Sequence, residues 1–286
     1  MEKIGIIDLG SNSARLVIVE LFGEGHFMVV DELKESVRLG QDMDRDGFLK
    51  PQRVAETIKT LKMFKKLCDA SRVDRIIAVA TAAVRRAKNQ RSFLDELQAT
   101  CGIKVKVLSE EEEATLVYRG VINSMDIPKG IILEIGGGST KIVYYNRRNM
   151  LNYATLPFGA VTLTDLFKEK VEEFFTEQLS HIEWLSEVEP DVQMIGVGGS
   201  FRNIFKISKL VRKYPLDTVH NYNLPVEDFE SIYDMIKVLD LDKKKKIKGL
   251  SSGRADILPA ALAVVKSFVH YMHYDNFVIG GSGLRE

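Results

Sequence analysis

The sequence predicts an α/β fold built from two similar halves. The first observation is a repeat, because residues 6–19 read IIDLGSNSARLVIV and residues 132–145 read ILEIGGGSTKIVYY. The second is that strand-like apolar runs alternate with helical patterns after each copy, which is typical of a mixed sheet covered by helices. The third is the length of 286 residues, which suits two domains. We therefore expect duplicated domains at residues 1–125 and 126–286.

Each copy of the repeat is expected to fold as a β-hairpin with a small-residue turn. Glycine lets the backbone approach a ligand closely, and successive N–H groups of a turn bind anions. A single copy is compatible with an ordinary tight hairpin, but duplication in register favours two turns that hold a phosphate chain across a cleft between the halves. The matched positions are Asp8 with Glu134, Gly10 with Gly136, Ser13 with Ser139, and Arg15 with Lys141.

The remainder of the first half alternates strand and helix patterns. Pro51 opens a helix because its fixed φ suits the first helical turn, and apolar residues follow at helical spacing. The run IIAVA at residues 76–80 is rich in β-branched residues and predicts a strand. In chain order we expect a strand at 26–33, a polar loop at 38–48, a helix at 51–70, a strand at 75–80, a helix at 90–100, a strand at 103–108 and a helix at 110–123.

The second half is expected to repeat this plan after its own hairpin. Its longest amphipathic pattern predicts one helix over residues 162–188, and a glycine-rich turn follows the strand that ends at Val197. The expected elements are a hairpin at 130–134 and 141–145, a strand at 150–156, the helix at 162–188, a strand at 192–197, a loop at 214–225, helices at 226–239 and 255–272, and a strand at 277–279.

Composition excludes some classes of partner. The chain has 40 basic and 40 acidic residues, so it has no overall field that would attract nucleic acid or an anionic membrane. Cys68 and Cys101 show no pairing pattern, so we expect buried thiols in a reducing compartment. With no signal peptide or membrane-spanning run before or after the first strand, a cytoplasmic location is expected. His270 and His273 lack a third ligand nearby, which argues against a metal role.

Two segments carry candidate catalytic side chains. Ser109–Glu113 reads as a capping box at the start of a helix, which explains one acid but does not require four; a carboxylate here could also act as a general base. Arg85 follows a buried strand, so its guanidinium is expected near the same sheet edge, either binding phosphate or as a surface arginine.

Taken together, these segments resemble the exopolyphosphatase and guanosine pentaphosphate phosphatase family, Ppx/GppA. That family belongs to the actin, Hsp70 and sugar-kinase superfamily of duplicated RNase-H-like domains, so the resemblance implies two such domains and an interdomain cleft. The matching motifs are IDLGSNSxRL at 7–16, ATAAVR at 80–85, SEEEEA at 109–114, EIGGGST at 134–140, GVGGS at 196–200, GLSSGRADILP at 249–259 and GLRE at 283–286, the last lying where the chains of relatives begin a further helix.

The resemblance implies hydrolysis of the terminal phosphoanhydride bond of inorganic polyphosphate, or of the 5′ γ-phosphate of guanosine pentaphosphate. Glu113 corresponds to the glutamate that activates water. The resemblance also implies a homodimer, so a second copy of the chain is an expected partner. Mg²⁺ is expected at Asp8 and Glu134. Another divalent cation could replace it, and a monovalent cation is a further option. The residues expected to contact phosphate are Ser11, Asn12, Ser13, Arg15, Arg85, Gly136, Gly137, Gly138, Ser139, Thr140, Gly198, Gly199 and Ser200.

Four positions depart from the family pattern. The family usually has aspartate where this chain has Glu134, and glutamate where it has Lys141. It usually has glycine at the position of Glu110 and often arginine at that of Thr115. The charge reversal at Lys141 weakens magnesium binding or lets the ammonium supply part of the cation's charge. A polyphosphate- or guanosine tetra/pentaphosphate-binding regulator with weak catalysis is therefore an alternative, and a kinase of the same superfamily is a weaker one.

Overall fold

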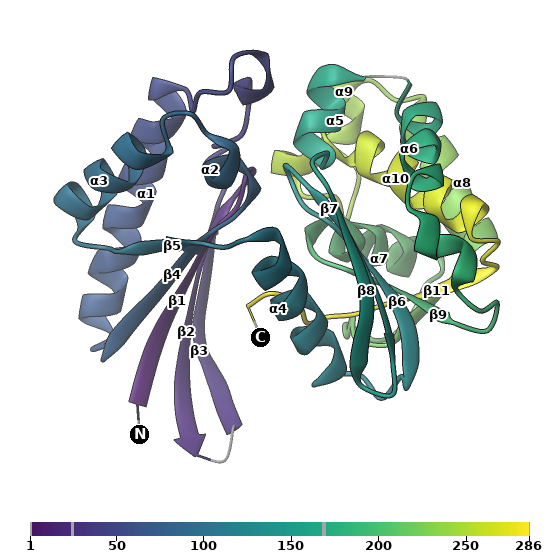
Figure 1. The fold of residues 1–286 in the computed structure, drawn as a ribbon, viewed down its shortest axis with the longest axis horizontal. Helices are drawn as coiled ribbons and strands as arrows, with labels where there is room; N and C mark the ends of the chain where they lie inside the picture. The colour runs from purple at the N-terminus through teal and green to yellow at the C-terminus, as the bar shows by residue number, and fades with distance from the viewer. Residues whose placement is uncertain (1, 24–25, 168–169, 286) are drawn as a thin grey trace. The chain divides into compact units, whose positions relative to one another are not determined.

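The chain forms two compact units. The computed structural model describes residues 2–23, 26–167 and 170–285 (Figure 1). The first unit contains the residues up to Glu110 together with Arg285, and the second contains Glu111–Leu284. Each unit is built on one mixed sheet, which confirms the predicted α/β fold class.

The sheet of the first unit has five strands in the order β3-β2-β1-β4-β5. The first three strands form an antiparallel meander, and β4 and β5 continue the sheet in parallel with β1. Several β-branched residues of these strands lie on a face of the sheet that packs against helices, as expected for such segments. The strands are β1 Glu2–Leu9, β2 Ala14–Gly23, β3 His26–Glu35, β4 Arg75–Ala80 and β5 Val105–Val107.

The second unit repeats this topology and extends it by one strand. Its sheet has the order β10-β11-β9-β6-β7-β8, in which β6, β7 and β8 form the meander and β9 pairs with β6 in parallel. The predicted duplication is therefore confirmed strand by strand. The strands are β6 Lys129–Ile135, β7 Thr140–Asn146, β8 Asn149–Leu156, β9 Gln193–Val197, β10 Tyr222–Pro225 and β11 Asn276–Ile279.

The two hairpins share the same register and the same turn. Asp8 faces Arg15 across β1 and β2, and Glu134 faces Lys141 across β6 and β7. The turn closes with a hydrogen bond from the backbone N of Gly10 to the carbonyl of Ser13 at 3.1 Å, and its counterpart from Gly136 to Ser139 measures 2.9 Å. The matched positions of the repeat are thus equivalent in space within their own units.

The helices of the first unit match the predicted boundaries closely. α1 and α3 pack together beside the sheet (Figure 1), and Cys68 and Cys101 are buried, unpaired thiols on these two helices. A short helix, α2, follows β4 directly. The helices are α1 Pro51–Ala70, α2 Ala82–Arg86 and α3 Gln90–Cys101.

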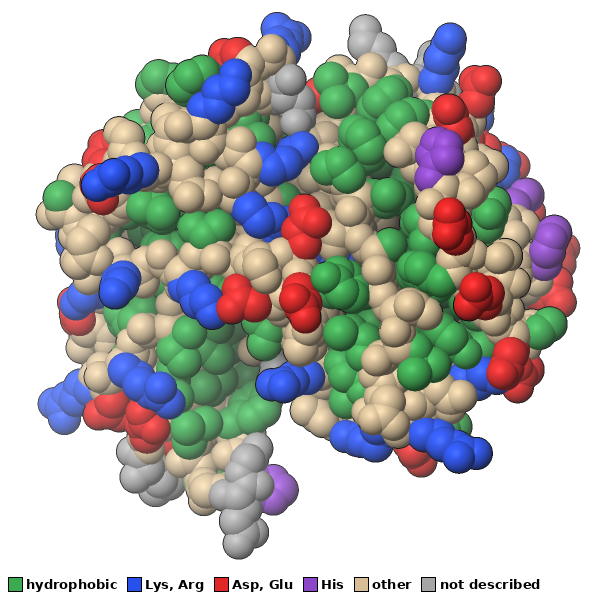
Figure 2. Space-filling model, in the orientation of Figure 1, with side chains coloured by type: hydrophobic (Ala, Val, Ile, Leu, Met, Phe, Trp, Pro, Cys, Tyr) green, Lys and Arg blue, Asp and Glu red, His purple; other side chains and the backbone are tan. Residues whose placement is uncertain are grey.

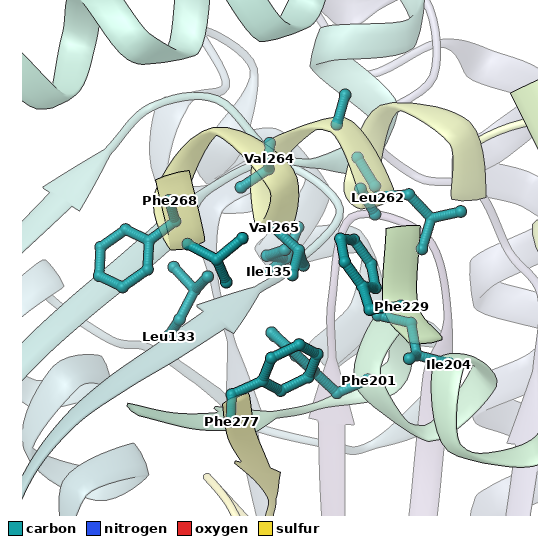
Figure 3. Close-up of a cluster of buried hydrophobic side chains, with 14 of the residues drawn as sticks. Leu133, Ile135, Phe201, Ile204, Phe229, Leu262, Val264, Val265, Phe268 and Phe277 are labelled. Atoms are coloured by element: carbon teal, nitrogen blue, oxygen red, sulfur yellow. The ribbon is translucent and has the colours of Figure 1, made fainter. Parts of the chain in front are cut away.

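The helices of the second unit enclose an apolar core against one face of its sheet. Figure 3 shows Phe201 and Phe229, from two helices, next to Phe277 of β11, and α10 lies over Leu133 of β6. Their rings meet edge to face, with Phe277 5.9 Å from Phe201 and 5.7 Å from Phe229 between centroids. The helices are α4 Glu110–Ile122, α5 Ala160–Leu166, α6 Val171–Ser180, α7 Gly199–Val211, α8 Val226–Lys237, α9 Leu241–Lys244 and α10 Leu258–Tyr271.

The single helix predicted over residues 162–188 is wrong. The structure has α5, α6 and a short 3-10 helix at Glu183–Glu187, and residues 168–169 of the predicted helix lie outside the described residues. Phe167 ends α5 and stacks on Phe174 of α6, with ring centroids 3.8 Å apart. Tertiary packing of these aromatic rings overrides the continuous amphipathic pattern.

The predicted loop at 214–225 is wrong at its end, where residues 222–225 form β10. Tyr222 pairs with Ile279 and Pro225 with Asn276 of β11, so the partner strand lies at the other end of the second unit's sequence. Local pattern does not show such long-range pairing. Pro225 ends an edge strand, a position that tolerates the missing N–H.

Helix α4 lies almost entirely in the second unit, whereas the sequence predicts it in the first domain. The expected boundary at residues 125/126 follows α4, whereas the compact units change at Glu110/Glu111 and so include almost all of α4 in the second unit. The cause is packing: Val117 and Tyr118 share an apolar cluster with Val143 and Tyr145 of β7. Glu113 consequently lies in the second unit.

Two surface properties bear on possible partners. On the face shown in Figure 2, acidic and basic side chains are interspersed, and neither sign forms a continuous field. Within the described parts of the chain, we find no helix of the length and apolarity needed to cross a membrane.

Candidate functional site

The glycine-rich turn of the second unit is held from one side by the start of α5. The backbone N of Ala160 donates to the carbonyl of Gly136 at 2.9 Å, and that of Val161 donates to the carbonyl of Gly137 at 2.8 Å. All described peptide bonds are trans, so the N–H of each peptide points opposite to its carbonyl. The N–H groups of Gly137 and Gly138 therefore point away from α5, which suits a concavity for anions.

Gly159 allows this close approach. A Cβ at Gly159 would lie 2.6 Å from the carbonyl carbon of Gly137 and from the backbone N of Ser139. Real Cβ atoms do not come so close to backbone atoms, so any other residue must displace the turn. Gly159 was not among the predicted site residues, because its role arises only from packing between segments.

The turn of the first unit is held in the same way by the loop after β3. Gly40 donates its backbone N–H to the carbonyl of Ser11 at 2.8 Å, and Arg38 donates to that of Asn12 at 2.9 Å. The N–H groups of Asn12 and Ser13 therefore point away from this loop. The side-chain Oδ1 of Asn12 is buried and has no hydrogen-bond donor among the described residues.

A buried ion cluster stands beside the second turn. Lys141 on β7 is 1% exposed, and Glu113 on α4 is 4% exposed. The Lys141 ammonium nitrogen, Nζ, lies 2.6 Å from Glu113 Oε1, 2.8 Å from Glu134 Oε2 and 3.0 Å from Ser139 Oγ. Hairpin register brings Lys141 opposite Glu134, and packing of α4 on β7 adds Glu113.

The cluster keeps Lys141 charged. Burial lowers the pKa of Lys141, but the charges of Glu134 and Glu113 and their hydrogen bonds outweigh burial, so the pKa lies above its usual range. The ammonium is therefore present throughout the physiological pH range. Because its three N–H donors meet three acceptors, this buried charge is fully hydrogen-bonded.

The donor set at Glu134 does not fit the expected magnesium ion. Hard divalent cations take carboxylate oxygens as ligands, but here oxygens of both Glu113 and Glu134 contact the Lys141 ammonium. A divalent cation about 4 Å from an ammonium is repelled by about 8 kcal/mol at an effective dielectric constant of about 20. Among residues 2–23, 26–167 and 170–285, no group of three or more His, Cys, Asp or Glu side chains is placed to hold a metal ion.

In the first unit, Asp8 and Arg15 belong to a chain of charges that includes Arg285. Arg15 Nη1 lies 3.2 Å from Glu32 Oε1, and Arg285 Nη1 lies 2.9 Å from the same oxygen. The Nε of Arg285 is 3.9 Å from Asp8 Oδ2. The GLRE motif thus supplies a second arginine to the acid of the first hairpin. A ligand role for Asp8 stays a prediction.

Arg85 is mostly buried at the sheet edge where β4 and β5 end, as expected. Its Nη1 donates to the carbonyl of Leu108 at 3.0 Å, and Nη2 lies 3.9 Å from Glu110 Oε1. These contacts do not fit the surface-arginine alternative. These contacts hold the guanidinium at the edge of the first unit's sheet, next to the start of α4. Its contact with phosphate stays a prediction.

Gly198, Gly199 and Ser200 begin α7, and they pack against a buried arginine that the prediction missed. Arg254 Nη1 donates to Ser200 Oγ at 3.2 Å, and a Cβ at Gly199 would collide with the same guanidinium. Burial lowers the pKa of Arg254 to about 10, with nearby Glu134 opposing this shift. Its Nε is buried without an acceptor among the described residues. The sequence feature that could have identified Arg254 is its position in the GLSSGRADILP motif at 249–259.

The structure thus brings together only part of the predicted set. Within the second unit, Glu113, Glu134 and Ser139 meet around Lys141, and within the first unit Asp8 and Arg15 face each other. The hydroxyl of Thr140 is buried and donates to the carbonyl of Phe158 at 2.8 Å, which is a structural contact. Catalytic and binding roles of these residues stay predictions, as does the cleft between the domains.

Comparison with known proteins gives one family. Residues 17–286 match the model of the Ppx/GppA phosphatase family. A guanosine-5′-triphosphate,3′-diphosphate pyrophosphatase from Pseudoalteromonas atlantica is 29% identical over 307 aligned positions, covering 100% of this chain and 57% of that protein. A bifunctional 3-dehydroquinate synthase/phosphatase from Fusobacterium nucleatum is 26% identical over 296 positions, covering 96% of this chain and 44% of that protein. The chain therefore spans about half the length of these relatives.

Solved structures show the same fold. An exopolyphosphatase from Cytophaga hutchinsonii superposes with a TM-score of 0.91 at 22% identity, covering 99% of this chain and 95% of the other. The Aquifex aeolicus member of the Ppx/GppA family superposes with a TM-score of 0.79 at 29% identity, with the same coverage. The first likeness, at its low identity, supports the fold alone.

Proposed function

Because this chain belongs to the Ppx/GppA phosphatase family, we propose that it is a hydrolase of phosphoanhydride bonds at the ends of phosphate chains. The observation that carries the proposal is the buried carboxylate of Glu113, fixed by Lys141 beside the N–H groups of the second glycine-rich turn. A held carboxylate can accept a proton from water, and a turn of N–H groups can stabilise phosphoryl charge, so the two together support phosphoryl transfer to water.

Each part of the proposed reaction has a residue of this chain. The turn N–H groups of both units and the guanidinium groups of Arg15 and Arg85 bind phosphoryl oxygens, since oriented donors stabilise negative charge where it develops. Glu113 accepts a proton from the attacking water. The water oxygen bonds to the terminal phosphorus, the bridging P–O bond breaks, and the shortened chain leaves with its oxygen negatively charged.

The proposed substrate is inorganic polyphosphate, with guanosine pentaphosphate as the competing one. The family resemblance of the motifs covers both, and the name of the Pseudoalteromonas relative supports the nucleotide. Phosphate release from polyphosphate of defined lengths, measured beside release from guanosine pentaphosphate, separates them. Absence of turnover with both would overturn the proposed hydrolase.

The residue test is Glu113→Gln. Loss of a general base costs about a hundredfold or more in turnover, whereas binding of the phosphate chain is retained. Glu111→Gln is the matched control, because Glu111 is an exposed acid on the same helix. Equal activity of the two variants would contradict the assignment of Glu113 as the base.

A second candidate function is a phosphate-chain sensor with weak catalysis. The ion pair between Glu113 and Lys141 favours it, because the Oε1 of Glu113 lies 2.6 Å from the ammonium and is already occupied by that contact. This alternative predicts binding of polyphosphate or guanosine tetraphosphate with little turnover. It also predicts that Glu113→Gln leaves the residual activity unchanged.

A further inference from the structure

The second hairpin carries a base where the family resemblance expects an acid. Lys141 is that base, and it lies opposite Glu134, the expected metal ligand. The equivalent position of the first unit is also basic, since Arg15 faces Asp8. Both hairpins of this chain therefore pair an acid with a base, and in the second hairpin the base contacts the carboxylate that a metal would need as a ligand.

The ammonium of Lys141 has the contacts that a small bound cation would have. Its nitrogen lies 2.6 to 3.0 Å from oxygens of Glu113, Glu134 and Ser139, which come from α4, β6 and the turn. These are three acceptors for three N–H donors. The side chain is 1% exposed, so neither water nor an added ion reaches it without rearrangement.

Cations already lie close to both carboxylates. Lys141 contacts Glu113 and Glu134, and the carboxylate of Glu134 acts electrostatically on both Lys141 and Arg254. A divalent ion would add two further positive charges next to the Lys141 ammonium. Such a charge is unfavourable in a water-poor site.

We propose that Lys141 is a tethered cation that takes the place of a divalent metal in the second unit. The ammonium offsets one of the two negative charges of Glu113 and Glu134, and the unit binds phosphate chains without Mg²⁺. The absence of a metal site follows from contacts within the second unit alone, while the identity of the ligand rests on the proposed function.

The first test measures metal binding and needs no substrate. Mn²⁺ is the probe, because its free concentration is read directly by electron paramagnetic resonance. The wild-type chain is expected to leave the free Mn²⁺ signal unchanged up to about 1 mM, the weak end of protein sites for hard divalent cations. One Mn²⁺ bound per chain with a dissociation constant below about 1 mM would overturn the proposal. The double variant Glu113→Gln with Glu134→Gln is the control: if it still binds the ion, the ion lies elsewhere and the proposal stands.

The Lys141→Glu variant is expected to gain a Mn²⁺ site. It adds a third carboxylate that faces Glu113 and Glu134, and the shorter side chain leaves the position of the ammonium open for the ion. If the variant is unfolded without metal, Mn²⁺ is expected to restore its circular dichroism spectrum, because metal binding and folding are coupled. Lys209→Glu is the control for charge: Lys209 pairs with Asp217 on the surface of the same unit. Failure of Lys141→Glu to bind or refold with Mn²⁺, or equal binding by the control, counts against the proposal.

The second test measures the ligand. Tripolyphosphate is expected to bind the wild-type chain in EDTA, by calorimetry. Lys141→Met, compared at a temperature at which circular dichroism shows it folded, is expected to bind at least about tenfold more weakly, because Glu113 and Glu134 without their ammonium repel the anion. Loss of wild-type binding in EDTA, regained with Mg²⁺, would overturn the tethered cation. If no phosphate chain is hydrolysed but Mn²⁺ is still excluded, the proposed hydrolase fails and the tethered cation stands.

Discussion

Lys141 links the stability of the second unit to the charges of its candidate site. Its neighbours Glu113 and Glu134 lie on different elements, α4 and β6. Only the pairing with Glu134 is between residues close in sequence. The pairing with Glu134 follows from the aligned repeat, because hairpin register places the fourth matched position opposite the first. The pairing with Glu113 depends on how α4 packs, which the capping pattern of the acidic run does not reveal.

We expect Lys141→Met to destabilise the second unit strongly. Removing one partner from a buried ion cluster leaves uncompensated charge and costs about 3–5 kcal/mol. Urea unfolding followed by circular dichroism measures this loss. The matched control is Lys243→Met, since Lys243 is exposed and pairs with Asp240 at 3.2 Å in the same unit, and its loss should cost about 1 kcal/mol or less. Equal losses for the two variants would show that the buried cluster contributes nothing special.

Gly159→Ala is expected to weaken anion binding without changing any charge. The added methyl displaces the turn at Gly137 and Ser139, and overpacking of this kind costs about 1–3 kcal/mol. Pyrophosphate binding by calorimetry and the thermal midpoint measure the two effects. Gly283→Ala is the control, because a Cβ there meets no atom within 4 Å. Unaltered binding by Gly159→Ala would contradict an anion site at this turn.

At the scale of elements, the hairpins and the helices of the first unit were predictable because their signals are local. Pro51 fixes the start of α1, and alternation of apolar residues fixes the strands. The second unit was harder. α7 received no prediction although Phe201, Ile204 and Phe205 follow at helical spacing, since the glycine pair before them was interpreted only as a turn.

Glu172 joins three helices of the second unit. It lies on α6, accepts hydrogen bonds from Tyr233 and from Lys237 of α8, and lies 3.5 Å from the ammonium of Lys266 on α10. Burial raises the pKa of Glu172, but these hydrogen bonds and charges outweigh it and hold the pKa below its usual value of 4.5. The carboxylate form is therefore the one that stabilises the helix packing.

Glu172→Gln should lower stability in a pH-dependent way. A depressed pKa in the folded state contributes stability above the unfolded value of 4.5, and this contribution is lost as the pH falls through the folded value. We expect a difference of about 1 kcal/mol at pH 7, given partial exposure. The difference should shrink below pH 4.5. Urea unfolding from pH 3 to 7 checks this, and a difference that does not vary with pH would contradict it.

At the scale of the whole molecule, each unit has its own core. The cluster around Phe64 and Phe93 belongs to the first unit, and the cluster around Phe201 and Phe277 belongs to the second. Domains with separate cores can unfold in separate steps, in which case one free energy does not describe the protein.

We expect calorimetry to resolve two unfolding components. Gly5→Ala places a methyl 2.8 Å from Cys68 Sγ in the first unit, and Gly196→Ala drives one into the ring of Phe201 in the second. Each substitution should cost about 1–3 kcal/mol and lower only its own component by several degrees. A single transition that both substitutions shift equally would show that the units unfold together.

Under the proposed function, the covalent attachment of the Lys141 charge has a consequence for the hydrolysis of long phosphate chains. Such chains are themselves strong chelators, so a hydrolase with a dissociable ion competes with its own substrate for that ion. An ammonium carried on β7 cannot be sequestered in this way. Under the proposed function, the second unit would keep the charge of Lys141 where polyphosphate has depleted free magnesium.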